Sequence, residues 1–235
     1  MKGKIMKPSE IIDKCFEMQK KMLIGFKGNL KVNKKKFAES LEPRQFAISL
    51  SGEPTLYPYL GELIKELRKR KITSFLVTNG LNPEVLQELQ KKNQLPTQLY
   101  LSVNAPNKTL FRKIVRSNLK NAWQLYMKTI KLFPKLKTRK VLRLTLVRGL
   151  NMQDIEDYAK LIKITGPDFI EVKGFMSVGF SRQRLGYERM PFHDEIKAFS
   201  KELAKLTGLK VLDEKIESRV VLLGKSKKRM KIKVQ

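Results

Sequence analysis

The chain has 235 residues, 41% of them hydrophobic, which is enough for a substantial core in one large or two small domains. Its 50 Lys and Arg against 22 Asp and Glu give a formal net charge of +28, which favours a polyanionic partner such as nucleic acid. No apolar run approaches the roughly eighteen residues that span a bilayer, and the first residues show no signal-peptide pattern, so we expect a cytoplasmic protein without a membrane partner. Cys15 is the only cysteine, which excludes an intrachain disulfide and a multi-cysteine metal site within these residues.

The N-terminal part predicts one helix and a basic loop. Helix formers run from Pro8 to Ile24, and Gly25 marks the end of the helix. Cys15 falls on the apolar face of this helix, so we expect a small buried residue rather than a nucleophile or ligand. In the loop that follows, Lys27 lies between Gly25 and Gly28. It is either a solvated turn residue or a lysine presented to a phosphate or carboxylate.

The next segment predicts a strand, a tight turn and a helix. The β-prone run 46–50 breaks at Ser51-Gly52-Glu53-Pro54, and Leu60 to Arg70 carries apolar residues at helical spacing. In a parallel α/β sheet such a turn lies at the carboxyl end of a strand, where ligands bind. Glu53 can accept charge-assisted hydrogen bonds from a bound ammonium group, and Gly52 lets a ligand approach the backbone.

The same strand–turn–helix pattern recurs along the chain. Further strands are predicted at residues 72–78, 99–103, 141–147 and 168–174, and helices at 83–90, 109–115, 122–132, 151–164 and 194–206. Polar residues end the strands: Thr78 and Asn79 end the second, and Ser102 and Asn104 alternate onto one side of the third.

Charged residues lie inside the fourth and fifth predicted strands. Arg143 must find a partner or water because an unpaired buried charge is costly, so it is a site candidate if it faces a barrel lumen. Glu171 and Lys173 share a face of the fifth strand. They form either an internal ion pair or a site in which Lys173 has a lowered proton affinity suited to carbonyl chemistry.

The C-terminal part is basic. A polar loop with three arginines is predicted at residues 178–191. Short antiparallel strands are predicted at residues 209–213, 219–224 and 230–234. A dense basic run at residues 225–233 is suited to phosphate contact. Five βα units predict an α/β fold, a partial parallel (β/α) barrel over residues 1–207, with a small antiparallel β appendage over 208–235.

Five segments together resemble archaeal tRNA 4-demethylwyosine synthase, the radical S-adenosylmethionine enzyme of wybutosine synthesis. They are SLSGEPTLYP (49–58), SFLVTN (74–79), QLYLSVN (98–104), RLTLV (143–147) and DFIEVKG (168–174). The resemblance also takes in Phe26-Lys-Gly28 and runs from about Pro8 to Gly224. It implies a radical-SAM partial barrel that lacks its first strand and binds S-adenosylmethionine and a [4Fe-4S] cluster.

The resemblance also implies a reaction and its partners. In this family the 5'-deoxyadenosyl radical attacks the methyl group of 1-methylguanosine at position 37 of phenylalanine tRNA. Two carbons of pyruvate, activated as a lysine Schiff base, close the third ring in a lyase-type reaction. The expected partners of this chain are therefore tRNA and pyruvate.

The resemblance assigns roles by position. The turn residues Ser51, Gly52, Glu53 and Pro54 are expected at the methionyl amino group of the cofactor. Its carboxylate and ribose are expected against Thr78, Asn79, Ser102 and Asn104, and Arg143 among the cofactor or substrate contacts. The candidates for the pyruvate lysine are Lys27 and Lys173, the latter beside Glu171. The basic tail and loop are expected to grip tRNA, the loop through Arg182, Arg184 and Arg189.

Two features depart from the family pattern. The three cluster cysteines, spaced CxxxCxxC, have no counterpart here, and the family's usual C-terminal extension does not follow Gly224. Asn104 also stands where relatives often carry an acid. Three explanations remain open: a natural half whose partner polypeptide carries CxxxCxxC, a truncated reading frame, or a non-catalytic tRNA-binding protein on the same barrel. We expect that this polypeptide alone binds no cluster and cleaves no S-adenosylmethionine.

Overall fold

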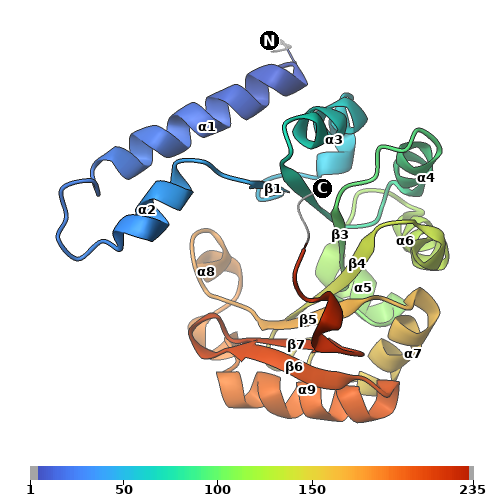
Figure 1. The fold of residues 1–235 in the computed structure, drawn as a ribbon. Helices are drawn as coiled ribbons and strands as arrows, with labels where there is room; N and C mark the ends of the chain where they lie inside the picture. Colours follow the sequence, from blue (N-terminus) through green and yellow to red (C-terminus); the bar gives the residue numbers. More distant parts are fainter. Residues whose placement is uncertain (1–4, 233–235) are drawn as a thin grey trace.

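The computed structural model describes residues 5–232, and its strands form one curved sheet of seven strands in the order β1-β2-β3-β4-β5-β7-β6 (Figure 1). Strands β1 to β5 are parallel, β7 is antiparallel to β5, and β6 is antiparallel to β7. The strands are β1 (Gln45–Ile48), β2 (Thr73–Thr78), β3 (Gln98–Ser102), β4 (Arg139–Leu146), β5 (Phe169–Gly174), β6 (Lys210–Lys215) and β7 (Val220–Gly224). The predicted α/β partial barrel with C-terminal antiparallel strands is confirmed. The division at residue 207 stays a prediction.

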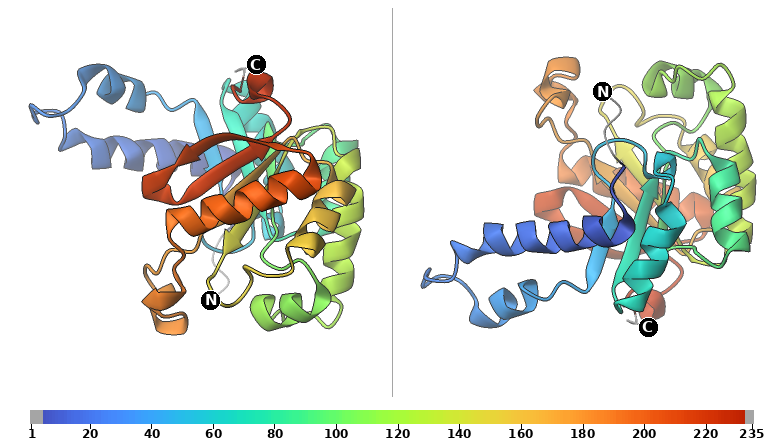
Figure 2. Two further views of the ribbon diagram at one scale, coloured as in Figure 1. Left: turned by 90° about the horizontal axis from the view of Figure 1, so that it is seen from below. Right: turned by 90° about the horizontal axis from the view of Figure 1, so that it is seen from above.

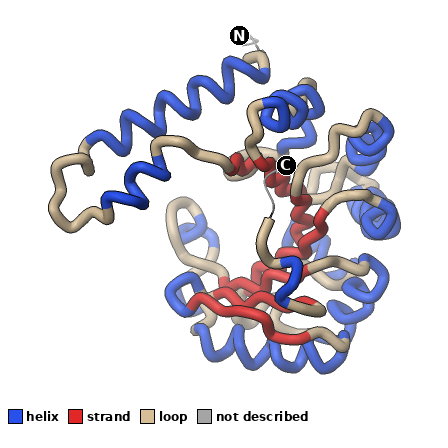
Figure 3. The backbone as a smooth tube through the Cα atoms, viewed as in Figure 1, coloured by secondary structure: helices blue, strands red, loops and turns tan. Residues whose placement is uncertain are grey.

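Helices cover the outer face of the sheet, as Figure 3 shows by colour. They are α3 (Leu60–Lys69), α4 (Pro83–Lys91), α5 (Lys108–Val115), α6 (Ala122–Leu132), α7 (Ile155–Thr165) and α9 (His193–Thr207). The short α8 (Ser181–Arg184) lies in the loop after β5. Within residues 5–232, no helix combines the length and the apolar content of a transmembrane helix.

The two faces of the sheet differ in burial because side chains alternate along each strand. On the outer face, Leu101, Leu144 and Val172 are at most 1% exposed and pack in the main hydrophobic core. On the inner face, Arg143 and Glu171 are only half-buried. The curved sheet therefore presents polar groups to an open lumen.

The N-terminal helices extend away from the sheet as an arm, which all the ribbon views show (Figures 1 and 2). The arm consists of α1 (Pro8–Ile24), α2 (Lys34–Ser40) and the loop between them. Only Ile12 of α1 is buried, in a small cluster with residues of α3. The expectation that Cys15 is buried is wrong: it is exposed, because the helix leaves the body of the protein after its first turns.

Two further predicted elements differ in the structure. The helix expected from residue 151 begins at Ile155, because the preceding residues form a turn in which Asn151 is buried. No strand forms at residues 230–232; instead, the Arg139 guanidinium donates a hydrogen bond of 2.9 Å to the carbonyl of Met230. The rest of that predicted strand includes residues outside the described part of the chain.

Candidate active site at the carboxyl ends of the strands

The turn after β1 is held to the end of β2 by the Glu53 carboxylate. Its Oε1 accepts hydrogen bonds from the backbone N–H and the hydroxyl of Thr55, at 3.2 and 2.7 Å, and from the Thr78 hydroxyl at 2.7 Å. Its Oε2 accepts the backbone N–H of Asn79 at 2.8 Å. The carboxylate thus joins two neighbouring strand ends, and Oε2 keeps acceptor capacity for one further donor.

The other predicted turn residues surround this carboxylate. Ser51 and Gly52 are exposed, and Gly52 has a φ of +81° with open space where a Cβ would stand. Pro54 begins a single 3-10 turn that Glu53 caps. An exposed glycine with no neighbouring atoms leaves the backbone of this turn accessible to a ligand.

Thr78 and Asn79 have different surroundings. Thr78 is 1% exposed, and its hydroxyl both donates to Glu53 and accepts the Gly80 N–H at 3.1 Å. The Asn79 side chain is exposed, with its Oδ1 accepting the Leu81 N–H at 2.9 Å. The amide group of Asn79 can therefore contact a ligand, whereas the buried Thr78 hydroxyl holds the Glu53 carboxylate and the following turn in place.

The ends of β3 and β4 are joined by Asn151, which is 1% exposed. Its Nδ2 donates to the carbonyls of Asn104 and Thr145 at 2.8 and 2.9 Å, and its Oδ1 accepts the Val147 N–H at 2.6 Å. The Oδ1 of Asn104 is buried and has no hydrogen-bond partner among residues 5–232. A buried acceptor without a partner at this edge fits a ligand that offers a hydroxyl or amine.

An arginine–glutamate pair lies in the lumen below this edge. Arg143 Nε is 2.8 Å from Glu171 Oε1, and the Arg143 guanidinium stacks over the Tyr100 ring at 4.5 Å. Ser102 is in register with Arg143 on the neighbouring strand. Burial raises the pKa of Tyr100, and the Glu171 charge raises it further. Tyr100 therefore stays neutral and supports the guanidinium from one side.

Glu171 pairs with Arg143, so the first of the two alternatives, an ion pair between Glu171 and Lys173, is wrong. Residues directly opposite on adjacent strands are closer than residues two apart on one strand, and Glu171 is in register with Arg143. Lys173 is half-buried on the same face and in register with Thr145. Lys173 therefore shares the lumen face of β5 with Glu171, two residues further along the strand.

Lys27 is not brought to this site. It lies on the exposed loop between α1 and α2, at the outer part of the arm (Figure 1). Sequence reasoning missed Tyr100 and Asn151. Strand alternation places Tyr100 on the same face as Ser102, so that residue could have been found, whereas nothing in the sequence marks Asn151 as the residue that joins two strands.

The described residues do not fit a metal cluster. Within residues 5–232, no group of three His, Cys, Asp or Glu side chains is arranged to hold a metal ion, and Cys15 is on the arm. An iron–sulfur cluster requires several thiolates, so this part of the chain supplies none of the expected set.

The chain was compared with known families and relatives. A model described as the radical SAM superfamily matches residues 32–162, and one described as wyosine base formation matches 164–225. The S-adenosyl-L-methionine-dependent tRNA 4-demethylwyosine synthase of Pyrococcus abyssi is 48% identical over 92% of this chain and 64% of its own length. The synthase of Methanocaldococcus jannaschii is 40% identical over 97% of this chain and 71% of its own.

Solved structures agree with this result. A structure of TYW1 with a lysine-pyruvate adduct bound matches with a TM-score of 0.84 and 39% identity, covering 96% of this chain and 72% of that one. Archaeal TYW1 matches with a TM-score of 0.79 and 36% identity over the same shares. The fold is that of a radical SAM protein.

Within that superfamily, the chain belongs to the S-adenosyl-L-methionine-dependent tRNA 4-demethylwyosine synthases. It spans 64% of the length of the two Pyrococcus relatives that it matches.

Proposed function

We propose that this chain provides the cofactor and substrate sites of a tRNA 4-demethylwyosine synthase, which converts 1-methylguanosine-37 of phenylalanine tRNA to the tricyclic base with pyruvate in a lyase-type reaction. The observation that carries the proposal is the juxtaposition, at one end of the sheet, of the Glu53 turn, the unpartnered Asn104 oxygen and the Arg143–Glu171 pair. Since the substrate is tRNA, we expect the protein to work in the cytoplasm.

The carboxyl edge fits S-adenosylmethionine. The open backbone at Gly52 and the remaining capacity of Glu53 Oε2 suit a methionyl ammonium group. Asn104 Oδ1 suits a ribose hydroxyl, and the ends of the neighbouring strands β2 and β3 also carry Asn79 and Ser102. When bound together, S-adenosylmethionine and a reduced [4Fe-4S] cluster supply radical chemistry; the role of these side chains is to hold and orient the nucleoside.

The cluster thiolates come from outside these 235 residues in this proposal. One cysteine cannot bind a cluster, and the chain spans 64% of the length of the Pyrococcus relatives. We therefore expect activity only when a polypeptide segment carrying CxxxCxxC is present.

Lys173 is the better candidate for pyruvate. Its amine can attack the ketone carbon of pyruvate, with loss of one water, to give a Schiff base. Arg143 lies on the neighbouring strand, and the part of its guanidinium that does not face Glu171 can donate to a carboxylate. The relative that holds a lysine-pyruvate adduct supports a lysine in this role but does not identify which one.

Reductive trapping tests the assignment. The chain, with its CxxxCxxC-bearing partner segment, is incubated with carbon-labelled pyruvate and cyanoborohydride, and the labelled peptide is identified by mass spectrometry. We expect label on the peptide containing Lys173 and its loss in Lys173→Arg, with Lys27→Arg as the matched control. Label that persists in Lys173→Arg would contradict the assignment.

A product assay tests the function itself. The same mixture, with S-adenosylmethionine, reductant and tRNA carrying 1-methylguanosine-37, should incorporate pyruvate carbon into the tRNA as a tricyclic base. tRNA bound tightly without any incorporation would instead favour a non-catalytic tRNA-binding protein.

A further inference from the structure

The loop between β5 and α9 exposes three aromatic side chains. Phe180 is 79% exposed, Tyr187 70% and Phe192 58%. Arg182, Arg184 and Arg189 lie between them along the loop. Aromatic rings of this size are normally buried, so three exposed rings in one loop require an explanation.

Folding of the loop does not explain them. The loop is anchored by other apolar side chains, since Phe175 and Met190 are buried against Val147. Backbone hydrogen bonds also attach it to the end of β4, from Phe175 N–H to the Leu146 carbonyl at 2.8 Å and from Arg148 N–H to the Arg189 carbonyl at 2.9 Å. The loop that carries Phe180 and Tyr187 is thus attached to the body of the protein on both sides of these rings.

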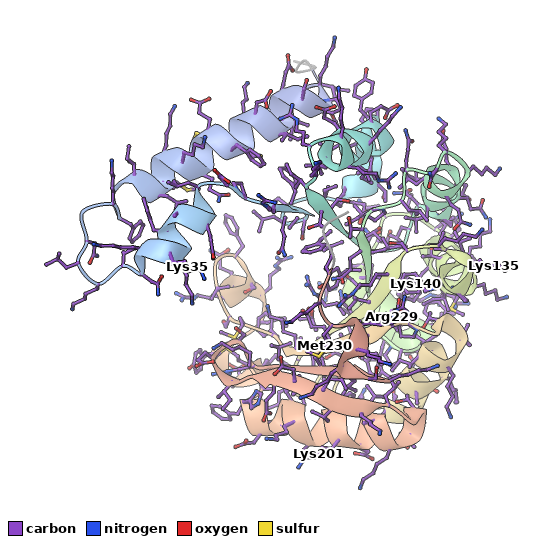
Figure 4. All side chains as sticks on the ribbon, in the orientation of Figure 1. Lys35, Lys135, Lys140, Lys201, Arg229 and Met230 are labelled. Carbon is purple, nitrogen blue, oxygen red and sulfur yellow. The ribbon has the colours of Figure 1, made fainter. Side chains whose placement is uncertain are left out.

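Arginines lie along the same loop and over one of its three rings. The guanidinium groups of Arg148 and Arg219 lie over the Phe192 ring at 5.0 and 5.4 Å. Arg182 and Arg184 are exposed, and Arg182 is oriented by a 2.9 Å hydrogen bond to the Ser177 carbonyl. Basic side chains occur over much of the molecule, from Lys35 on the arm to Lys201 on α9 (Figure 4), so charge alone does not locate an RNA site. The combination of exposed rings with arginines is what distinguishes this loop.

The loop lies at the functional end of the sheet. It follows the carboxyl end of β5, the edge that also carries the Glu53 turn. Both views of Figure 2 place α8 and the end of the described chain at opposite sides of the protein. Nucleotides next to one that enters the site would reach this loop rather than the basic tail.

We propose that Phe180 and Tyr187 form a base-stacking platform for unpaired nucleotides of the tRNA loop, with the neighbouring arginines contacting the phosphates. This inference rests on the proposed function, because it takes tRNA as the substrate. Stacking on aromatic rings is tolerant of base identity and requires unpaired nucleotides. The platform therefore selects a single-stranded loop over duplex RNA.

Binding to an unmodified RNA hairpin with the anticodon-loop sequence tests the proposal. Phe180→Ala/Tyr187→Ala should weaken binding about tenfold or more at every salt concentration, with an unchanged slope of log affinity against log salt. Arg182→Gln/Arg184→Gln should reduce that slope. The variant Phe180→Trp/Tyr187→Phe keeps an aromatic ring at both positions and should retain wild-type affinity. Ile216→Ala is the control, because Ile216 is an exposed apolar residue in the β6–β7 connection.

A fluorescent base reports stacking directly. With 2-aminopurine in the hairpin loop, binding of the wild-type chain should quench the fluorescence, and the double-alanine variant should not at saturating protein. Wild-type affinity and quenching in that variant would overturn the platform while leaving the proposed function intact. A wild-type chain that does not bind the hairpin would overturn the platform, and the product assay would still decide the proposed function. A third outcome is that the wild-type chain is a dimer, and that the double-alanine variant is a monomer with unchanged RNA affinity. The rings would then contact a second copy of this chain, which would also overturn the platform.

Discussion

Two side chains join neighbouring strand ends at the functional edge, and they do so in different ways. Glu53 links the β1 turn to β2 with an ionised carboxylate that is half-buried and retains acceptor capacity. Asn151 links β3 to β4 with a neutral amide that is 1% exposed and has its donors and acceptor directed at backbone groups. The first link supports the turn and keeps acceptor capacity for a further donor; the second is support alone.

The difference shows what a charged residue at a strand end can mean. A glutamate in a turn is naturally interpreted as a ligand-binding group, yet four hydrogen bonds of Glu53 are to the protein itself. The turn is therefore preorganised before any ligand binds, which lowers the ordering cost of binding.

Breaking the Asn151 link should have the largest effect. Asn151→Ala leaves the Val147 N–H and two carbonyls at strand ends without their buried partner, and we expect a loss of about 3 kcal/mol in the free energy of unfolding. Urea unfolding followed by circular dichroism measures it. Asn118→Ala, at an exposed position, is the control. A loss below about 1 kcal/mol would show that the amide is dispensable.

Removing the charge of Glu53 should have the next largest effect. Glu53→Gln keeps the shape of the side chain but replaces its charge-assisted hydrogen bonds with weaker ones. It also replaces one acceptor oxygen with an NH2 donor, which would face the Asn79 N–H or the hydroxyls of Thr55 and Thr78. We expect about 2 kcal/mol of destabilisation in the absence of ligand. The exposed Glu62→Gln is the matched control. Equal stability of the two variants would mean that Glu53 serves the ligand only.

The Arg143–Glu171 pair should show strong coupling. Glu171→Leu leaves the half-buried arginine without its partner and should cost about 1–2 kcal/mol, whereas adding Arg143→Met to it should restore most of the loss. A double-mutant cycle in urea measures the coupling energy. Additive effects would indicate that water already satisfies both groups in the lumen.

The smallest effect concerns acid stability at Glu195. The hydrogen bond from Arg148 lowers its pKa below the ordinary 4.5, and the Phe192 N–H lowers it further. A lowered folded-state pKa gives stabilisation that is present above the ordinary pKa and lost as pH falls through the folded value. Because both side chains are more than a third exposed, we expect Glu195→Gln to cost less than about 1 kcal/mol at pH 7, and progressively less as the pH falls below 4.5. Urea midpoints measured across this range check it; a constant difference would contradict it.

The sequence predicted elements better than it predicted contacts. The five parallel strands and the turn at Glu53 follow from β-prone runs that break at polar residues and glycine. The partner of Glu171 did not follow, because its nearest neighbour is set by the register between β4 and β5 and not by spacing along one strand. Cys15 was predicted to be buried because helical periodicity identifies an apolar face without saying whether anything packs on it. The sequence predicts a helix that starts at Asn151, because a buried asparagine that joins two strands cannot be told from a helix-capping asparagine by sequence.

Anaerobic reconstitution with iron and sulfide tests the central claim most directly: these residues hold the cofactor and substrates, and the cluster thiolates come from elsewhere. The chain is reconstituted alone and together with a CxxxCxxC-bearing segment, then assayed for 5'-deoxyadenosine with tRNA and pyruvate. We predict cluster absorbance at about 400 nm and product only in the mixture. Cluster absorbance and 5'-deoxyadenosine from the chain alone would contradict the account.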